Sequence, residues 1–266
     1  MDPMSINLLL DRMVDGANRI YFKGEKLDPY HMMHLAGKIM SLALIAGFAL
    51  FSGEPRMWRF YILFIPLAYL YQVLYVDRIK PLLFKSNNQS FLQDTILFLL
   101  PLTCLLIWLL RIPFGHGLDL FGLILPLMLG FRRIGCFLGG CCFGLPSRIG
   151  VLYPEHVRED FPEDRKQNPL LIPPATRVFP IQLVESLFSL ALFAGLAARL
   201  WVTRDFSGLT MLLFVWIYST YRFISDFFRV SSVRPRYLNG KFSEAQVASL
   251  ILIFVCSALY FAIVQS

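Results

Sequence analysis

Residues 118–138 read LDLFGLILPLMLGFRRIGCFL, an apolar run that carries two arginines near its end. A helix needs about 20 mostly apolar residues to cross the hydrocarbon core of a bilayer, and this run is long enough. Arg132 and Arg133 stand where charge is costly and usually functional. The segment therefore predicts a membrane-spanning helix that brings basic groups to one membrane face.

The composition of the whole chain agrees with a membrane protein. Of its 266 residues, 56% are hydrophobic and only 16% are charged, whereas a soluble domain usually has about 25% charged residues. This deficit excludes a disordered chain, a coiled coil and a basic nucleic-acid-binding domain. In a membrane protein, the net charge of +7 reflects basic residues that set the orientation or face lipid headgroups.

The fold class predicted by this pattern is an all-α integral membrane protein, with residues 1–266 forming a single domain. We expect seven transmembrane helices, because seven apolar segments are each long enough to span. Pro66, Pro101 and Pro126 interrupt three of them, which membrane helices tolerate when neighbouring groups satisfy the freed carbonyls. The segments are 31–52, 57–76, 91–111, 118–138, 180–201, 208–228 and 245–264.

Two further segments lie outside these spans. In residues 1–30, apolar side chains from Ile6 to Ile20 recur at helical spacing, with charged residues between them. We interpret this segment as an N-terminal interfacial amphipathic helix; an ordinary helix that packs on another chain is the alternative. Residues 139–179 hold six prolines and many charges, and they predict a long functional loop that caps one membrane face.

The distribution of Lys and Arg predicts an orientation. Sixteen basic residues lie on the side that holds the N-terminus and residues 139–179, against five on the opposite side. By the positive-inside rule, this count places the N-terminus in the cytoplasm.

The sixth expected span contains polar side chains that lipid would not tolerate. Such a set either locks helices together through an ion pair of Arg222 with Asp226, or binds an anionic lipid headgroup. The second interpretation is favoured, with Asp226 holding the arginine fork in position. Spacings of four, four and three place four residues on one helix face: Tyr218, Arg222, Asp226 and Arg229.

The fifth expected span opens with the sequence PIQLVE, residues 180–185. Pro180 is compatible with a helix start, and Gln182 and Glu185 share a helix face. A buried Glu185 either anchors a nearby arginine through hydrogen bonds or acts as an acid or base. The anchor is favoured.

A glycine-rich stretch, GFRRIGCFLGGCCFG, covers residues 130–144. Its five glycines allow the backbone to approach another backbone or a ligand closely. Arg132 and Arg133 could reach a phosphate at the interface. Tight helix packing with snorkelling arginines explains the segment equally well.

Three of the five cysteines lie within this stretch. Cys136, Cys141 and Cys142 follow a C-x4-C-C pattern, which lacks the second paired motif of a structural zinc site. A disulfide from Cys136 to Cys141 or Cys142 is an alternative on an oxidising face. Simple packing as small buried side chains is favoured.

Together, these three segments resemble the prolipoprotein diacylglyceryl transferase family of bacterial membrane enzymes. The family signature, roughly G-R-I-G-N-F-x-N-G-E-x-x-G-R, is similar to residues 132–144, and its H-P-x-Q-L-x-E is similar to residues 179–185. Its Y-G-x-x-R-F-x-x-E-x-x-R is similar to residues 218–229, with Asp226 in place of Glu. The order of the motifs and the seven spans agree, and the resemblance covers about residues 110–230.

The resemblance implies a transferase that moves the diacylglyceryl group of phosphatidylglycerol to the lipobox cysteine thiol of a prolipoprotein. The products are a thioether and glycerol phosphate. The implied partners are phosphatidylglycerol, lipobox-containing prolipoproteins and membrane lipid, with no nucleic acid, no metal and no soluble cofactor. The implied location is the bacterial cytoplasmic (inner) membrane, multi-pass, with the active site and the cap loop 139–179 on the extracytoplasmic side, which is opposite to the charge count.

The resemblance also implies roles for individual residues. Arg133 and Arg222 are the expected catalytic clamp on the lipid phosphate, and Tyr218 the expected hydrogen-bond donor to a phosphate oxygen. Glu185 and Asp226 would orient the guanidinium groups. The full set of expected substrate-binding residues is Arg132, Arg229, Gln182, Glu185, Asp226, Gly135, Gly140 and Gly144.

Some positions depart from the family pattern, and the general base is therefore open. The family's H-G-G motif has no clear counterpart, although His116 and His34 are candidate bases. Cys136, Cys141 and Phe179 stand where the signatures have Asn, Glu and His. A divergent homologue that transfers or binds lipid with a different acceptor is the alternative function, and a transporter or channel is a less favoured one.

Overall fold

The computed structural model describes residues 2–62, 78, 92–159, 173, 175–230, 236–237 and 242–265. The chain divides into two compact units, each built from separate stretches of sequence. Unit 1 comprises Met1–Ile39, Leu127–Ala191 and Ile224–Pro235. Unit 2 comprises Met40–Pro126, Leu192–Phe223 and Arg236–Ser266.

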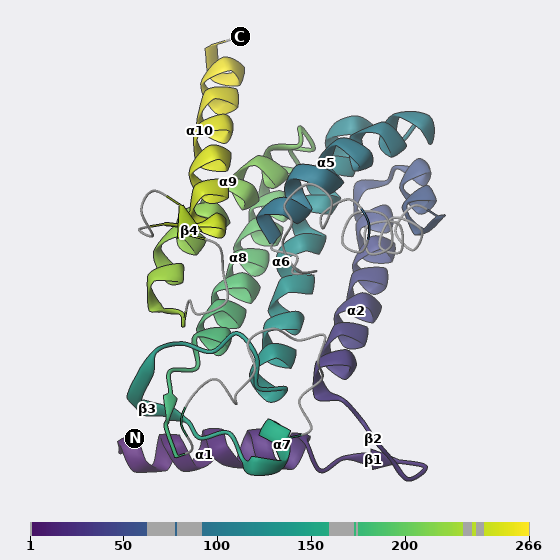
Figure 1. The fold of residues 1–266 in the computed structure, drawn as a ribbon. Coiled ribbons are helices and arrows are strands. Elements are labelled where there is room, and N and C mark those ends of the chain that lie inside the picture. The colour runs from purple at the N-terminus through teal and green to yellow at the C-terminus, as the bar shows by residue number, and fades with distance from the viewer. Residues whose placement is uncertain are drawn as a thin grey trace. The chain divides into compact units, whose positions relative to one another are not determined.

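The described part of the chain is mostly helical, as predicted (Figure 1). Two short antiparallel hairpins, β1–β2 and β4–β5, were not predicted. Lys23 and Gly24 form the turn of the first hairpin with φ of 51° and 85°, values that suit a two-residue hairpin turn. The helices are α1 Pro3–Ala17, α2 Pro29–Ser52, η1 Pro55–Arg59, α5 Leu92–Leu109, α6 Phe114–Leu138, α7 Glu155–Glu159, α8 Ile181–Thr203, α9 Leu209–Ser225, η4 Asp226–Phe228 and α10 Glu244–Gln265; the strands are β1 Tyr21–Phe22, β2 Glu25–Lys26, β3 Pro146–Val151, β4 Arg236–Tyr237 and β5 Phe242–Ser243.

Among the described residues, α2, α6 and α8 are long and apolar enough to cross a membrane. In α5 and α10, the corresponding apolar stretches are shorter, Leu99–Leu109 and Glu244–Tyr260. Pro101 and Pro126 lie inside α5 and α6 without ending them. The expected span at 57–76 lies mostly outside the described residues. The described part of the chain therefore contains three helices that agree with the predicted membrane protein in length and composition.

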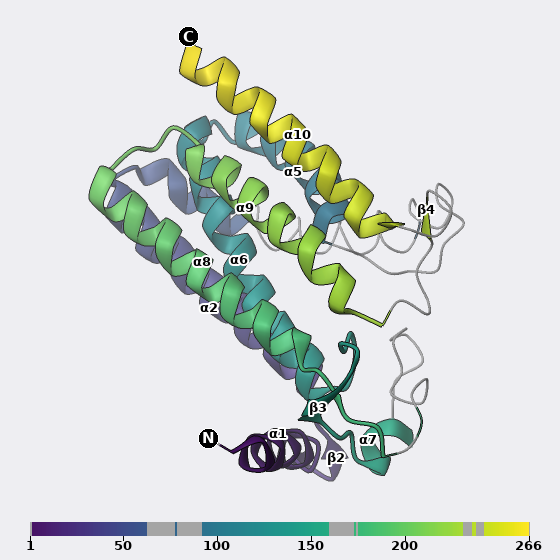
Figure 2. The same cartoon turned by 90° about the vertical axis from the view of Figure 1, so that its left-hand side faces the viewer.

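In unit 1, α1 lies against β3 in both views (Figures 1 and 2). Leu10 and Val14 of α1 are buried in an apolar cluster with residues of the cap, including Val151 and Val157. Polar contacts of α1 join the same surface. Asn7 accepts a hydrogen bond from Gly150 N at 2.9 Å, Asp11 accepts one from Leu152 N at 2.8 Å, and Arg177 pairs with Asp11 at 2.8 Å.

The side of α1 that contacts the cap carries polar as well as apolar residues. Asp11 binds the cap, while Leu9 and Met13 are exposed. The reason is that backbone N–H groups of the cap need acceptors, and the short polar side chains of α1 supply them. The described residues of the segment 139–179 include β3, α7 and bridges from Val178 to Pro146 and Val151.

In unit 2, α6 caps the start of α9. The Asp119 carboxylate accepts hydrogen bonds from Gly208 N at 3.0 Å and Thr210 N at 2.9 Å, and so satisfies N–H groups that a helix N-terminus leaves open. Gly122 allows the close approach, since a Cβ there would lie 2.7 Å from the Met211 Cα. Farther along, Trp216 of α9 donates to the Ser257 hydroxyl of α10 at 3.2 Å.

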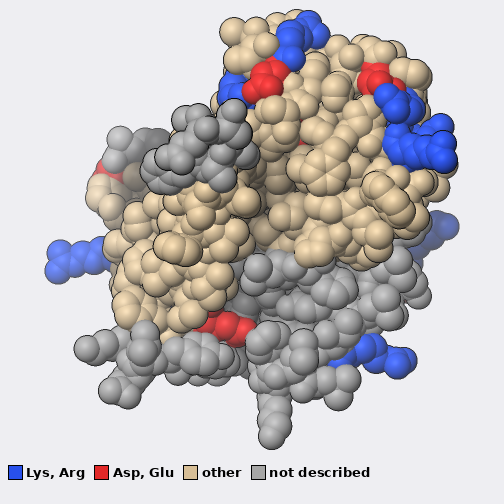
Figure 3. Space-filling view, turned by 90° about the horizontal axis from the view of Figure 1, so that it is seen from above, with Lys and Arg blue, Asp and Glu red and all other residues tan. Residues whose placement is uncertain are grey.

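Several described charged side chains of unit 2 form ion pairs with one another. On the face seen in Figure 3, most of the described surface is formed by residues other than Lys, Arg, Asp and Glu. Arg56 contacts Glu54 at 2.7 Å, and its hydrogen bonds lower the pKa of Glu54 to about 2. Arg199 pairs with Asp205 at 2.7 Å. Such pairing is expected of charged side chains in a membrane protein.

One sequence prediction about the sixth span is wrong. The α-helix does not continue to Arg229; it ends at Ser225, and Asp226–Phe228 form a 3₁₀ turn. Arg229 is extended (φ −102°, ψ 148°) and forms a β-bridge with Gly144. Tyr218 and Arg222 lie in α9, so the four polar residues do not share one regular helix face. Pairing with a backbone partner at Gly144 replaces the last helical turn.

A substitution at Gly150 tests the packing of the cap. A Cβ at this position would lie 2.2 Å from the Val178 carbonyl oxygen, which is backbone and cannot move aside cheaply. We expect Gly150→Ala to reduce the free energy of unfolding by about 1–3 kcal/mol, measured by thermal unfolding in detergent micelles. The control is Gly195→Ala in α8, where no atom lies within 4 Å and a gain of about 0.5–1 kcal/mol is expected. Equal effects of the two variants would contradict this packing.

Candidate functional site

The candidate site is built in unit 1 around the carboxylate of Glu185, in the first turns of α8. Glu185 Oε2 lies 2.9 Å from Nε of Arg133, near the end of α6, and also contacts Nη2 of Arg229. The Glu185 and Arg229 side chains are 0% and 1% exposed, whereas that of Arg133 is 12% exposed. The structure therefore brings together three expected site residues, and Arg133 is the most accessible of them.

The backbone holds the three segments of this cluster side by side. Arg229 donates from Nη1 to the Cys142 carbonyl at 3.1 Å. Gly144 N donates to the Phe179 carbonyl at 2.9 Å, and Leu145 N donates to the Phe228 carbonyl at 3.0 Å. A Cβ at Gly144 would lie 2.8 Å from the Phe179 oxygen, so this position needs glycine for close approach.

Gln182 anchors the loop that follows α6. Its Nε2 donates to the Cys141 carbonyl at 2.7 Å and lies 3.3 Å from the Tyr153 hydroxyl. Tyr153 in turn donates to the Phe137 carbonyl at 3.1 Å. Burial raises the pKa of Tyr153 well above its ordinary value, so the hydroxyl stays protonated and able to donate. Sequence reasoning missed Tyr153, because no motif surrounds it.

Other expected site residues of unit 1 lie at the junction of α2 and α6. Arg132 Nε donates to the Tyr30 hydroxyl at 3.0 Å. The ring of His34, one turn further along α2, lies 6.2 Å from the ring of Tyr30. Gly135 allows α2 to approach, since a Cβ there would lie 3.1 Å from the Tyr30 Cα. Tyr30 was also missed, although a tyrosine at the start of an apolar helix is a common interfacial residue.

Three expected site residues lie in unit 2. Tyr218 and Arg222 of α9 are 0% and 1% exposed, and Tyr218 stacks on Phe214 with ring centroids 5.7 Å apart. His116 lies in the first turn of α6 and stacks on Phe206 at 4.3 Å. Arg133 is near the opposite end of the same helix. His116 therefore does not share a helix end with Arg133.

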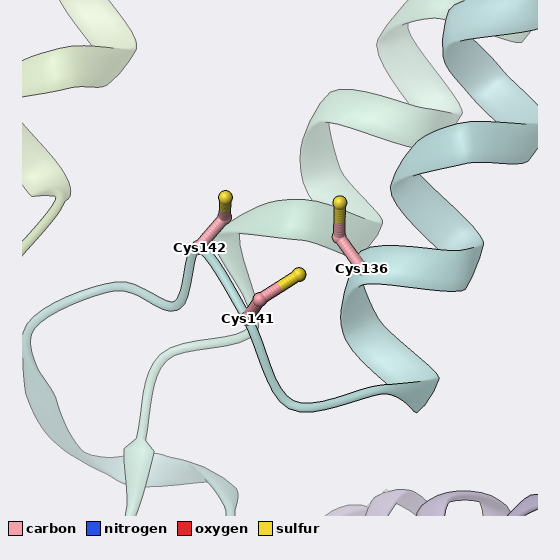
Figure 4. A group of neighbouring side chains, drawn as sticks. All are labelled: Cys136, Cys141 and Cys142. Atoms are coloured by element: carbon pink, nitrogen blue, oxygen red, sulfur yellow. The ribbon is translucent and has the colours of Figure 1, made fainter. Parts of the chain in front are cut away.

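Three thiols lie beside the arginine cluster (Figure 4). The Sγ atoms of Cys136, Cys141 and Cys142 lie within 4.8 Å of one another, and all three are free cysteines. Arg133 Nη1 is 3.9 Å from the Cys136 Sγ. Hydrogen bonds from the Cys136 and Cys141 thiols, with the charges of Arg133 and Arg229, lower the pKa of Cys142 well below its ordinary value.

Two expected site residues remain to be placed. Gly140 lies in the loop after α6 and has φ of +74°, and Asp226 is buried in η4.

The arginines of this cluster are suited to bind an anion, and the three cysteine thiols lie beside them. A guanidinium whose Nε is held by a carboxylate presents a fixed fork, and such forks bind phosphate and carboxylate groups. The cluster lies at the end of α6 and the start of α8, two of the described helices that are long and apolar enough to cross a membrane.

Comparison with known proteins identifies the chain. The sequence model described as prolipoprotein diacylglyceryl transferase matches residues 57–262. The chain belongs to the prolipoprotein diacylglyceryl transferase family. The family assignment made from the three motifs is thereby confirmed.

Relatives that bear the full enzyme name share part of this chain. Phosphatidylglycerol–prolipoprotein diacylglyceryl transferase 2 of Clostridium perfringens is 34% identical over 150 residues, covering 54% of this chain and 51% of that protein. The enzyme of Clostridium tetani is 33% identical over 145 residues, covering 52% of this chain and 51% of that protein. The enzyme of Fervidobacterium nodosum is 31% identical over 150 residues, covering 55% and 46%. The chain thus spans about half the length of the curated relatives it matches.

Removing the shared carboxylate should be costly for this family member. We expect Glu185→Gln to lower the free energy of unfolding by about 3–5 kcal/mol, because it leaves buried guanidinium charge without its anion. The measurement is thermal unfolding in detergent micelles, with Glu25→Gln at an exposed hairpin residue as control. The double variant Glu185→Gln, Arg229→Gln should lose less than the sum of the two single variants. Additive losses would show that the two side chains are not coupled.

Proposed function

We propose that this chain transfers the diacylglyceryl group of phosphatidylglycerol to the lipobox cysteine thiol of a prolipoprotein. Membership of the family and the enzyme names of its relatives support this activity. The observation that carries the proposal for this chain is the Arg133–Glu185–Arg229 cluster at the end of α6 and the start of α8. In this cluster, the guanidinium of Arg133 contacts Glu185 and would meet the phosphate of the lipid.

Arg133 is the proposed contact with the phosphate. In the reaction, the thiolate attacks the glycerol carbon, the carbon–oxygen bond breaks, and the electron pair leaves with glycerol phosphate. Negative charge therefore grows on the leaving group, and a positioned cation stabilises it in the transition state. The ion pair of Glu185 with Nε of Arg133 is the proposed means of orienting the guanidinium before substrate arrives.

Arg222 and Tyr218 are proposed as a second phosphate contact from α9. Further substrate-binding roles are proposed from the family motifs. Arg132, Arg229 and Gln182 contact neighbouring groups, Asp226 is buried, Gly135 and Gly144 allow close approach, and Gly140 adopts a positive φ. His34 is the candidate base that remains on the same unit as Arg133.

The proposed setting is a bacterial cytoplasmic membrane. We propose seven spans, with residues 1–30 at the interface, and with the active site and the loop 139–179 on the extracytoplasmic side. The three long apolar helices support crossing of the membrane, and the apolar surface would receive the two acyl chains. Arginines that bind an anionic lipid explain why this side is basic despite the positive-inside rule. A reporter fused to the C-terminus tests this orientation, because it shows whether that end of the chain is cytoplasmic or external.

The phosphate contacts are tested by transfer activity. Purified protein is incubated with labelled phosphatidylglycerol and a lipobox peptide, and the thioether product is measured. We expect Arg133→Ala and Arg222→Ala each to lower the rate by about 10²–10³-fold, because each removes a contact to developing charge. Arg12→Ala, at an exposed residue of α1, is the matched control and should keep full activity.

The results separate residue roles from the activity itself. An unchanged rate in Arg133→Ala or Arg222→Ala would refute the role of that residue. Folded wild-type protein that yields no thioether product would refute the proposed transfer and would favour a different acceptor.

A further inference from the structure

The loop after α6 is shaped so that three thiols converge. Cys136 lies in the last turn of α6, and the four residues from Phe137 to Gly140 separate it from the adjacent pair Cys141-Cys142. Gly140 and Cys142 have φ of +74° and +59°, on either side of Cys141. A left-handed conformation is strained for a residue with a Cβ, and such strain concentrates at functional sites. Figure 4 shows the three side chains directed toward one region.

The sulfur positions suit a metal ion. Around an ion with Zn–S bonds of about 2.3 Å, tetrahedral sulfurs lie about 3.8 Å apart. The three Sγ atoms already lie within 4.8 Å of one another, so a small contraction would complete the arrangement. Among the described residues, this group offers three ligand atoms. Three protein ligands with a fourth open position are typical of catalytic rather than structural zinc.

The surroundings offset the charge of such a site. Three thiolates with one Zn²⁺ carry a net charge of −1, which would be costly in a buried position without cations nearby. Arg133 Nη1 lies 3.9 Å from the Cys136 Sγ, and Arg229 Nη1 donates to the Cys142 carbonyl. Gln182 Nε2 donates a hydrogen bond to the Cys141 carbonyl at 2.7 Å. Polar groups therefore fix the loop that bears all three sulfurs.

We propose that Cys136, Cys141 and Cys142 bind Zn²⁺ and leave a fourth coordination position that accepts the thiol of the acceptor cysteine. This inference rests on the proposed function, and it assigns the activation of the nucleophile to a metal in place of a histidine base. A thiol that coordinates zinc is deprotonated outright. Coordination would thus produce the thiolate beside Arg133, the proposed phosphate contact.

The step balances without any further reactant. The acceptor thiol binds zinc and releases its proton to water. Its sulfur then attacks the glycerol carbon of phosphatidylglycerol, the bond from that carbon to the phosphate oxygen breaks, and the electron pair leaves with glycerol phosphate. The product is a thioether, which has no negative charge to hold it on the metal, so it dissociates and zinc regains its open position.

The metal site is tested first by binding alone. Purified protein in nanodiscs is expected to hold about one zinc ion per chain by elemental analysis. Cys136→Ser, Cys141→Ser and Cys142→Ser should each lose most of it, whereas Cys256→Ser, at a buried cysteine of α10, should retain it. Protein loaded with Co²⁺ should show a thiolate-to-cobalt absorption band. Absence of zinc, copper in its place, or a disulfide that blocks Co²⁺ binding would overturn the proposal.

The open position is tested with the lipobox peptide. Addition of the peptide to Co²⁺-loaded protein should shift the cobalt spectrum, and the same peptide with Ser in place of its Cys should not. Chelation should lower the transfer rate by about a hundredfold or more, and Zn²⁺ should restore it. This reversal in the wild-type protein keeps the test valid even if a cysteine variant fails to fold.

The two proposals fail in different ways. Full transfer by metal-free protein would overturn the zinc site and leave the diacylglyceryl transferase function standing. A cobalt spectrum that responds to the peptide thiol, without any thioether product from phosphatidylglycerol, would support the thiol-binding zinc site and refute the proposed donor. A cobalt spectrum indifferent to the peptide thiol would overturn the open position.

Discussion

Charged groups that leave water lose several kcal/mol of solvation each, and a membrane protein can bury them only in mutual contact. The contact of Glu185 with Arg133 and Arg229 meets this condition. It joins the end of α6, the start of α8 and the strand-like segment after α9, so the arrangement of unit 1 depends on it. The same contact places a carboxylate beside Arg133, the proposed phosphate contact, and so links stability to the proposed chemistry.

The rest of unit 1 supports this contact in simple ways. Gly144 permits backbone segments to lie within hydrogen-bonding distance, and Gln182 and Tyr153 satisfy carbonyl groups that the end of α6 leaves open. The cap packs on α1 through Val14 and neighbouring apolar side chains. Each of these contacts fixes the loop of the three cysteines as well as the arginines, which is why a phosphate contact and a metal site could coexist there.

The sequence pattern predicted the long apolar helices, because their formation depends on local composition. The bounds of α2, α6 and α8 agree with the expected spans to within a few residues, because a bilayer-spanning helix needs only a sufficient apolar run. The end of α9 at Ser225 was missed, since Arg229 pairs with Gly144, far away in the sequence. The convergence of the cysteines was missed too. C-x4-C-C spacing resembles no familiar zinc motif, and the positive φ of Cys142 is a tertiary outcome.

The central claim is that Glu185 holds Arg133 in place to bind the phosphate of the lipid donor. Cryo-electron microscopy of the protein in nanodiscs with phosphatidylglycerol tests it most directly. The account predicts headgroup density against the Nη atoms of Arg133 while Glu185 contacts Nε, and it predicts that this density is absent in Arg133→Ala. Phosphate bound away from Arg133, or density unchanged in the variant, would contradict it.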